Sequence, residues 1–573
     1  MRVLALLLLA ACVRPEARWP QAPEVSAQCQ AAELQRRPDA AVRALLGAPS
    51  AATRARAALA VGRIGDAQAA GRLSQLLLDG EVGETAAWAL GRIEGGHLAL
   101  VNCLSRSCPS AAAAARALAG AVAGKAPQVE ALVAALSGAA ADEAAFALGI
   151  LARNPEARFP PQAWAALAAA LPRAGAAYAL SRLPKGSAPG LQEALAAAAR
   201  SADPWTRSLA ARAWGRQGLP AKGLAASFDD PDWRVRVEAA RGLATAPGAA
   251  ALLAEVVPRQ RSPHVLVALF EAAAQLGPDA LAAVPLTSPD LVVRCAAAQA
   301  RDRIRKQLID TPTCEAGGEQ RSPALSKEVN SVHQVEWRGR ARTGALAAEL
   351  ELAEPARAAL RDPDARVRGA AAGAAGPALF DEVAKLLADP DPYVVQEAAG
   401  TLAKEPNPNA ALAAALKQPP PPIAVPPEAR ALPAARRLRL RTSRGDLLID
   451  LRPDVAPLTS SALAALAARH FYDGLSFHRV VPDFVVQGGD PRGDGDGGPG
   501  WALPDEHSPL RFLRGTLGIA TSGPETGGSQ FFLCHSPQPH LDGRYTIAGQ
   551  LAAGDDVLDA LQPGDTILAA SAE

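Results

Sequence analysis

The sequence is short of three things: aromatic residues, an excess of charge of either sign, and long apolar runs. Only 4% of its 573 residues are aromatic although 49% are hydrophobic, and the formal net charge is +1. A nearly neutral chain offers no electrostatic reason to bind nucleic acid or acidic partners. Beyond the first twelve residues, no stretch is long and apolar enough to span a membrane. The remainder is therefore expected to be soluble, and it is too long for a single core.

Alanine supplies the hydrophobic content that aromatic residues do not, and it favours helices. It also recurs in repeats: Ala60–Ile64 (AVGRI) returns 29 residues later as Ala89–Ile93 (ALGRI). A second signature recurs from Asp230–Asp232 (DPD) to Asp362–Asp364 (DPD). Weaker copies of it begin at Asp203, Ser262, Ser288 and Asp389. Aspartate and proline start helices well, and each apolar helix face that follows needs a neighbouring repeat to cover it.

These repeats resemble short HEAT-like repeats, in which pairs of antiparallel helices stack into an all-α solenoid. We assign residues 27–417 to this array, interrupted by a polar, aperiodic insertion at about 302–344. The resemblance implies that a client or another protein partner binds along the concave face. The alternative is a spacer that only holds the C-terminal region away from a membrane.

The start of the chain predicts a targeting segment. Arg2 precedes the apolar run Val3–Ala11, which is far too short to cross a bilayer as a mature helix. The run ends in LAAC, which resembles the lipobox of bacterial lipoproteins and implies cleavage before Cys12 and acylation of that cysteine. We therefore expect a signal peptide at 1–11 and a lipidated tether at 12–26. An ordinary secretory signal with an incidental cysteine is the alternative.

A lipobox implies a place in the cell envelope. The protein would be held to the membrane by its acyl chains alone and would face the periplasm, with the outer membrane as the expected carrier. Disulfides are permitted in that compartment. Cys103 and Cys108 flank a four-residue loop, and Cys314 in the insertion could pair with Cys295. Zinc at the first pair would need two further ligands, and none is spaced nearby, so no metal site is expected.

The C-terminal quarter differs in composition from the repeats. A linker at 418–436 contains the proline-rich stretch Gln418–Pro433, which predicts a semi-rigid polyproline II spacer. Arg437–Thr442 then alternates arginine with leucine, which predicts a half-buried strand. A turn leads into Leu447–Leu451, and Leu458–His470 is helical. The short strands and glycine turns that follow favour an antiparallel barrel.

One stretch of this region carries the chemistry. Phe477–Pro491 (FHRVVPDFVVQGGDP) mixes arginine and glutamine into a β-branched and aromatic run, which predicts a strand that closes in a turn. Arginine is costly to bury unless it is paired or takes part in function. Arg479 is therefore either a satisfied structural residue or a functional one.

Three motifs together carry a resemblance to a known family. Phe477–Pro491, Gly515–Phe532 (GTLGIATSGPETGGSQFF) and His540–Gly549 (HLDGRYTIAG) resemble a cyclophilin-type peptidyl-prolyl cis-trans isomerase, over residues 437–573. The resemblance implies an eight-stranded antiparallel β-barrel with two capping helices, at the end of a multidomain chain. It also implies rotation about X–Pro bonds in proline-containing clients. No covalent bond breaks in this reaction, so no cofactor is expected.

The reaction turns an amide about its partial double bond, against a barrier of about 18–20 kcal/mol. It needs an apolar pocket for the proline ring and a donor that stabilises the twisted amide more than either planar form. The resemblance implies that Arg479 is this donor, with Phe484 and Gln487 completing the catalytic group. The implied substrate-binding residues are Ile519, Phe532 and Leu541 in the proline pocket, Ala520 and Thr521 facing the residue before proline, and Tyr545 as a ring donor. Gln530, like Gln487, would bond the substrate backbone and hold Arg479.

The sequence departs from the family at His540, where animal cyclophilins have a tryptophan that contacts cyclosporin. Inhibitor sensitivity therefore stays open. A second function also stays open, namely a scaffold lipoprotein whose C-terminal domain binds proline segments with little or no turnover.

Overall fold

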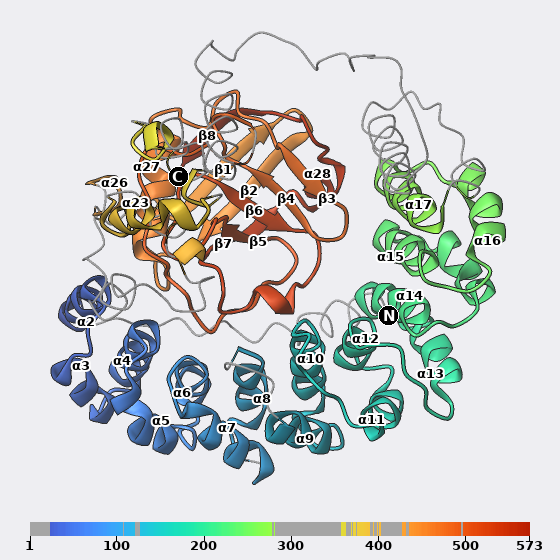
Figure 1. The fold of residues 1–573 in the computed structure, drawn as a ribbon, viewed down its shortest axis with the longest axis horizontal. Helices are drawn as coiled ribbons and strands as arrows, with labels where there is room; N and C mark the ends of the chain where they lie inside the picture. Colours follow the sequence, from blue (N-terminus) through green and yellow to red (C-terminus); the bar gives the residue numbers. More distant parts are fainter. Residues whose placement is uncertain are drawn as a thin grey trace, which may run out of the picture.

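The computed structural model describes residues 23–277 except 107 and 121–125, scattered residues between 280 and 402, residues 427–430, and residues 435–573 except 494 and 496. The first long stretch is helical, and the last is built on one β-sheet (Figure 1). We call residues 23–277 the helical band and residues 435–573 the β-domain. The prediction of a mainly helical N-terminal region is confirmed.

The helices of the band lie in two rows along a curve (Figure 1). In the inner row each helix packs against the next. This row contains α2 (Pro23–Gln35), α4 (Ala51–Ile64), α6 (Gly83–Leu90), α8 (Ala111–Gly120), α10 (Ala141–Leu151), α12 (Ala174–Leu180), α14 (Pro204–Arg216), α15 (Trp233–Leu243) and α17 (Pro263–Leu276). The outer row contains α3 (Ala40–Ala44), α5 (Ala70–Leu76), α7 (Gly96–Ser105), α9 (Ala126–Ala135), α11 (Gln162–Ala170), α13 (Leu191–Ala198) and α16 (Ala249–Val256).

Short 3-10 turns and three further helical pieces complete the described helices. The turns are η2 (Leu45–Gly47), η3 (Ala67–Ala69), η4 (Ala221–Asp229), η5 (Val257–Arg259), η6 (Pro377–Leu379) and η7 (Leu386–Ala388). The other helices are α23 (Phe380–Lys385) and α26 (Pro427–Arg430) before the sheet, and α27 (Pro457–Ala468) within the β-domain. None of the helices among the described residues has the length and apolar character needed to cross a membrane.

The glycine of the repeated Gly-Arg pair allows neighbouring inner helices to touch. A Cβ atom at Gly215 in α14 would lie 1.9 Å from the carbonyl oxygen of Gly242 in α15. A Cβ atom at Gly91, which ends α6, would lie 2.8 Å from the carbonyl oxygen of Ala117 in α8. Because close-packed interiors leave no room for such atoms, a larger residue here would force the helices apart. This contact explains why the pair recurs in the sequence.

The predicted helix starts are confirmed at two places and shifted at a third. Asp203 accepts hydrogen bonds from the backbone N–H groups at the start of α14, where Pro204 is the first helical residue. Pro263 is likewise the first residue of α17, although Ser262 before it makes no side-chain capping hydrogen bond. In the third copy of the signature Asp232, rather than Asp230, caps the helix, which is α15.

In the band, an arginine near the start of one inner helix pairs with an aspartate that precedes the next one, at Arg54–Asp79 (2.7 Å) and Arg207–Asp230 (2.7 and 2.9 Å). An arginine and an aspartate pair in the same way at Arg368–Asp389 (2.8 and 2.9 Å). The two-pronged geometry of the last two pairs is the strongest form of such a contact. The same link between neighbouring helices therefore recurs along the chain.

The β-domain is a curled antiparallel sheet of eight strands in the order β3-β4-β6-β5-β7-β2-β1-β8. The strands are β1 (Arg437–Thr442), β2 (Gly445–Leu451), β3 (Arg479–Val481), β4 (Val485–Gly488), β5 (Thr516–Ile519), β6 (Phe531–Cys534), β7 (Ile547–Ala553) and β8 (Ile567–Ala572), with η8 (Pro539–Leu541) and helix α28 (Asp555–Ala560) beside them. The chain before β3 bridges to the start of β8, because Phe477 N–H donates to the Asp565 carbonyl at 2.8 Å. The eight strands and two helices expected from the sequence are present.

The linker prediction is wrong at Pro427–Arg430, where the chain forms the helical turn α26 instead of an extended spacer. Ala429 is buried against Leu458 and Ala462 of α27, so this turn gains an apolar surface to pack on. Other sequence predictions lie outside the described residues: the signal peptide at 1–11, Cys12, Cys295 and Cys314, the insertion at 302–344, and most of the linker at 418–436.

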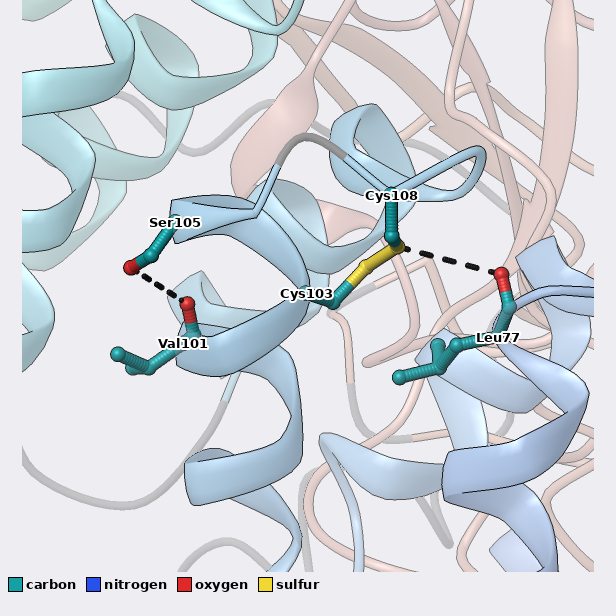
Figure 2. The surroundings of a disulfide bond; sticks show 5 residues. All are labelled: Leu77, Val101, Cys103, Ser105 and Cys108. Carbon is teal, nitrogen blue, oxygen red and sulfur yellow. Dashed lines mark hydrogen bonds between the residues drawn. A yellow bond between two sulfur atoms is a disulfide. The ribbon is translucent and has the colours of Figure 1, made fainter.

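Cys103 and Cys108 form a disulfide that ties the end of α7 to the loop before α8 (Figure 2). Their Cα atoms are 5.1 Å apart, and the sulfur of Cys108 lies 4.0 Å from the carbonyl oxygen of Leu77. Cys29 and Cys534 are free and buried. The prediction that Cys534 fills space as a small buried residue is confirmed.

The β-domain lies inside the curve of the band (Figure 1). Arginines of the inner row donate to its backbone carbonyls and to a carboxylate of α28. These contacts are Arg63 to Val455 O (2.7 Å) and His507 O (2.8 Å), Arg92 to Gly543 O (2.8 Å), Arg241 to Pro482 O (2.8 Å), and Arg234 to His535 O (3.2 Å) and to both Asp559 oxygens (2.8 Å each). The two parts are therefore joined by polar contacts, most of them partly buried, along the band.

Candidate active site

A chain of hydrogen bonds holds Arg479 at the edge strand of the sheet. The register of β3 and β4 sets Arg479 opposite Gln487, and the guanidinium donates to Gln487 Oε1 at 3.2 Å. Gln487 Nε2 donates to Gln530 Oε1 at 3.0 Å. Gln530 Nε2 in turn donates to the carbonyls of Gly495 and Gly497, both at 2.8 Å. The guanidinium is exposed, and this chain of hydrogen bonds holds it in place.

A tight turn brings Phe484 back over this arginine. Phe484 N–H donates to the Val481 carbonyl at 3.0 Å, and Asp483 between them has a φ of 54°, a conformation that aspartate tolerates. The Arg479 guanidinium carbon lies 5.9 Å from the centre of the Phe484 ring. The turn therefore sets an aromatic face directly beside a fixed cation.

Most of the predicted pocket residues meet in one apolar cluster. Phe532 and Tyr545 pack edge to face there, with ring centroids 5.8 Å apart. The cluster joins Phe484, Val485, Phe512, Ala520, Phe532, Cys534, Leu541, Tyr545 and Ile547, with Leu510 at its margin. Val485 was not predicted as a site residue. Its position directly after Phe484, at the start of β4, could have indicated it.

Two predicted residues behave differently from the rest. Ile519 is 2% exposed and packs in the main core of the β-domain, with Phe531 and Leu517, rather than in the cluster around Phe484. Thr521 is half-buried beyond the end of β5, next to Ala520, whose N–H donates to the Gln530 carbonyl at 3.0 Å. The apolar cluster therefore includes the other predicted pocket residues but neither Ile519 nor Thr521.

His540 forms a wall of the site. Its ring stacks on Phe484 with centroids 5.5 Å apart, and the side chain is 9% exposed. Burial, together with the positive charges of Arg182 and Arg153, lowers the pKa of His540 to about 3. The ring is therefore neutral at physiological pH and acts as a flat apolar surface. Both arginines belong to the band, so the band reaches the edge of the site.

Two buried carboxyl groups stand beside the site where the β-domain meets the band. Burial and the nearby Glu238 carboxylate raise the pKa of Asp483, despite the neighbouring Arg241. Burial raises the pKa of Asp542 to about 7, and its Oδ1 accepts a hydrogen bond from Phe512 N–H at 2.8 Å. In their protonated form, both carboxyl groups stabilise the fold in which the β-domain packs against the band.

We expect stability to depend on pH through Asp542. A carboxyl with a raised pKa stabilises the fold fully below its unfolded pKa of about 3.9, and this contribution is lost as pH rises through about 7. Asp542→Asn keeps the acceptor for Phe512 but cannot titrate. The melting temperature of the wild type relative to this variant should therefore fall by a few degrees from about pH 5 to about pH 8. Thermal scanning of both proteins checks this, and parallel profiles would contradict the assignment.

The site combines an apolar cluster with a cationic donor held beside it. An apolar recess suits a small ring such as that of proline, and a donor held in place before the reaction needs no rearrangement to stabilise new charge. His478, His535 and His540 all come from the β-domain, yet no group of three or more potential metal ligands occurs among the described residues. The geometry favours a reaction that proceeds by binding a substrate and polarising it with the guanidinium.

Residues 437–571 match the family model described as cyclophilin type peptidyl-prolyl cis-trans isomerase/CLD. A peptidyl-prolyl cis-trans isomerase of Synechococcus elongatus is 47% identical over 131 residues, which are 22% of this chain and 90% of the relative. One of Helicobacter pylori is 45% identical over 132 residues, 22% of this chain and 81% of the relative. The crystal structure of a cyclophilin type isomerase of Cryptosporidium parvum is 34% identical with a TM-score of 0.24, and covers 24% of this chain and 98% of that one.

Proposed function

Because the chain belongs, through its C-terminal domain, to the cyclophilin-type peptidyl-prolyl cis-trans isomerases, we propose that it isomerises X–Pro bonds in protein clients of the cell envelope. In this proposal the β-domain is the catalytic unit and the helical band holds the client. The isomerase class follows from the family, whereas the clients, the residue roles and the part played by the band are proposed.

The observation that carries the proposed mechanism is the fixed guanidinium of Arg479. As an X–Pro amide twists, its resonance is lost and the imide nitrogen becomes pyramidal and basic. Arg479, held by the Gln487–Gln530 chain, donates to that nitrogen in the twisted state. Since neither planar form offers the same acceptor, the contact lowers the barrier rather than merely binding substrate.

The proline ring lies in the recess formed by Phe484, Phe532 and Leu541, with Val485 beneath. Ala520 and Thr521 face the preceding residue, and Tyr545 supplies a ring donor, as the family resemblance implies. Gln487 and Gln530 hold Arg479 through their side-chain amides, which is one part of the role expected for them. Their contact with the substrate backbone remains part of the proposal.

The helical band is a HEAT-like α-solenoid in this proposal. Its two rows of helices, the close contacts at the repeated glycines and the recurring arginine–aspartate pairs support that class. A mere spacer would have no reason to enclose the domain that it carries. The partly buried contacts of Arg63 and Arg234 with the β-domain therefore favour a scaffold that presents clients to the site.

An extracytoplasmic, lipid-anchored location is proposed on two grounds. The LAAC sequence at Cys12 has the form of a lipobox, and the Cys103–Cys108 disulfide requires an oxidising compartment to persist. Acylation at Cys12 would leave the folded chain outside the cytoplasm, on the periplasmic side of the outer membrane.

A comparison of the full chain with residues 437–573 tests the activity and the scaffold together. The relative from S. elongatus consists almost entirely of this domain, so the fragment is expected to fold alone. Small neutral proline peptides should be isomerised equally well by both proteins in a protease-coupled assay. A client whose refolding is limited by proline should be accelerated more by the full chain, because docking makes the second encounter intramolecular.

The outcomes of this comparison separate the alternatives. Equal acceleration of every client by both proteins would reduce the band to a spacer. Binding of proline peptides without turnover by either protein would favour the second function, a scaffold whose β-domain only recognises proline segments.

A further inference from the structure

Arginines lie at the ends of several inner helices of the band, and their contacts differ. A first group near the N-terminal end, Arg63 and Arg92, donates to backbone carbonyls of the β-domain. A second group, Arg153 after α10 and Arg182 after α12, has side chains without a hydrogen-bond or ion-pair partner among the described residues, whereas the arginines that end α14 and α15 donate to carbonyls of the band or the β-domain. The second group therefore has binding capacity that the folded chain leaves unused.

This second group lines a cavity of about 450 Å³ between the ends of α10, α12, α14, α15 and α17. Five arginines and one carboxylate, Glu271, contribute to its wall. A second carboxylate, Glu238, lies behind the wall at 2% exposure and bonds to Arg212 and Arg241. The five arginines are Arg153, Arg182, Arg212, Arg216 and Arg241. The cavity therefore carries a clear excess of positive charge.

Arg182 is the member least satisfied by the folded chain. Its Nε is buried without a hydrogen-bond partner in the described part of the chain, and its guanidinium rests on the Tyr178 ring at 5.3 Å. Burial lowers the pKa of Arg182, and the positive charge of Arg212 adds to this. An anion in the cavity would relieve both the missing hydrogen bond and the repulsion.

The cavity adjoins the isomerase site. Arg241 from its wall donates to the Pro482 carbonyl, in the turn that carries Phe484. His540, which stacks on Phe484, lies within reach of the charges of Arg153 and Arg182. A polypeptide bound with its proline beside Phe484 can therefore place neighbouring side chains in the cavity.

We propose that this arginine cavity binds aspartate or glutamate side chains of client residues that flank the isomerised proline. The inference rests on the proposed isomerase function and adds a substrate class to it. Carboxylates fit because the planar forks of arginine pair with them through two hydrogen bonds, and because the adjoining site accepts a polypeptide. The small net charge of the whole chain makes this a local preference rather than a general attraction to anions.

The test uses the full chain and labelled proline peptides with two aspartates, or two asparagines at the same positions, placed before or after the proline. At low salt, fluorescence anisotropy should show at least one aspartate peptide binding about tenfold more tightly than its asparagine partner. The kcat/KM for that peptide should rise by a similar factor, and added salt should reduce both differences.

Matched variants locate the effect. Arg153→Gln with Arg182→Gln should remove the preference for aspartate, and the corresponding lysine pair should retain part of it. Arg106→Gln with Arg200→Gln removes the same charge from exposed positions at the ends of α7 and α13, and should keep the preference in full. Persistence of the preference in the first glutamine pair would overturn the cavity as its source.

Equal binding of aspartate and asparagine peptides by the wild type would also overturn the inference. Failure of the proposed function gives a different result, because the protein would then turn over no peptide at all. The anisotropy measurement does not depend on turnover, so it decides the inference in either case.

Discussion

Replacing Arg479 with alanine is expected to lower the kcat/KM of the full chain for proline peptides by about one to three orders of magnitude, as for loss of one fixed transition-state donor. The guanidinium is exposed and bonds only to Gln487 among the described residues, so its removal should leave the fold intact. Circular dichroism and thermal unfolding would confirm this. The protease-coupled assay measures the loss.

Three controls make the result specific to the fixed donor. Arg441→Ala removes an exposed arginine from β1, at the opposite end of the strand order, and should have no effect. Arg479→Lys keeps the charge but loses the fork, so an intermediate loss is expected. Gln487→Ala removes the hydrogen bond that holds Arg479, so we expect a smaller loss of activity than in Arg479→Ala. Wild-type activity in Arg479→Ala would show that this residue is structural.

Much of the site could be predicted because its parts are local in the sequence. Arg479, Phe484 and Gln487 lie on one hairpin, where strand alternation and the turn at Pro482 determine which side chains face each other. The helix start at Asp203-Pro204 was equally local, since the cap and the first turn involve only neighbouring residues.

Other features depend on contacts between distant segments, which periodicity does not reveal. The sequence alone does not show which apolar cluster Ile519 joins. The pairing of β5 with β6 places it in the main core of the β-domain. The anchoring of Gln530 by the Gly495 and Gly497 carbonyls requires a loop path that no residue pattern encodes.

The arginine cavity is the clearest case of this limit. The repeated Gly-Arg pair was visible in the sequence, but the same arginine has different surroundings from one repeat to the next. Arg63 meets a carbonyl of the β-domain, whereas Arg182, which follows a serine instead of the glycine, lines the cavity and rests on Tyr178. That difference arises because a compact domain fills only part of a curved band, and it exists only in the assembled chain.

The remaining large effect concerns the anchor. Acyl chains on Cys12 are the proposed attachment of the whole protein, and no described helix could replace them. Two or three buried chains hold a protein firmly at a bilayer. Removing the thiol should therefore abolish membrane retention rather than weaken it.

Cys12→Ala is expected to leave the precursor without fatty acid and to release the protein from the membrane fraction. Metabolic labelling with a fatty acid followed by membrane fractionation measures both effects. Cys29→Ala is the matched control, because Cys29 is a free buried thiol in α2 and should not be acylated; this variant should keep label and membrane association. Label retained in Cys12→Ala would show that the lipobox assignment is wrong. Loss of label with unchanged membrane association would show that another segment anchors the chain.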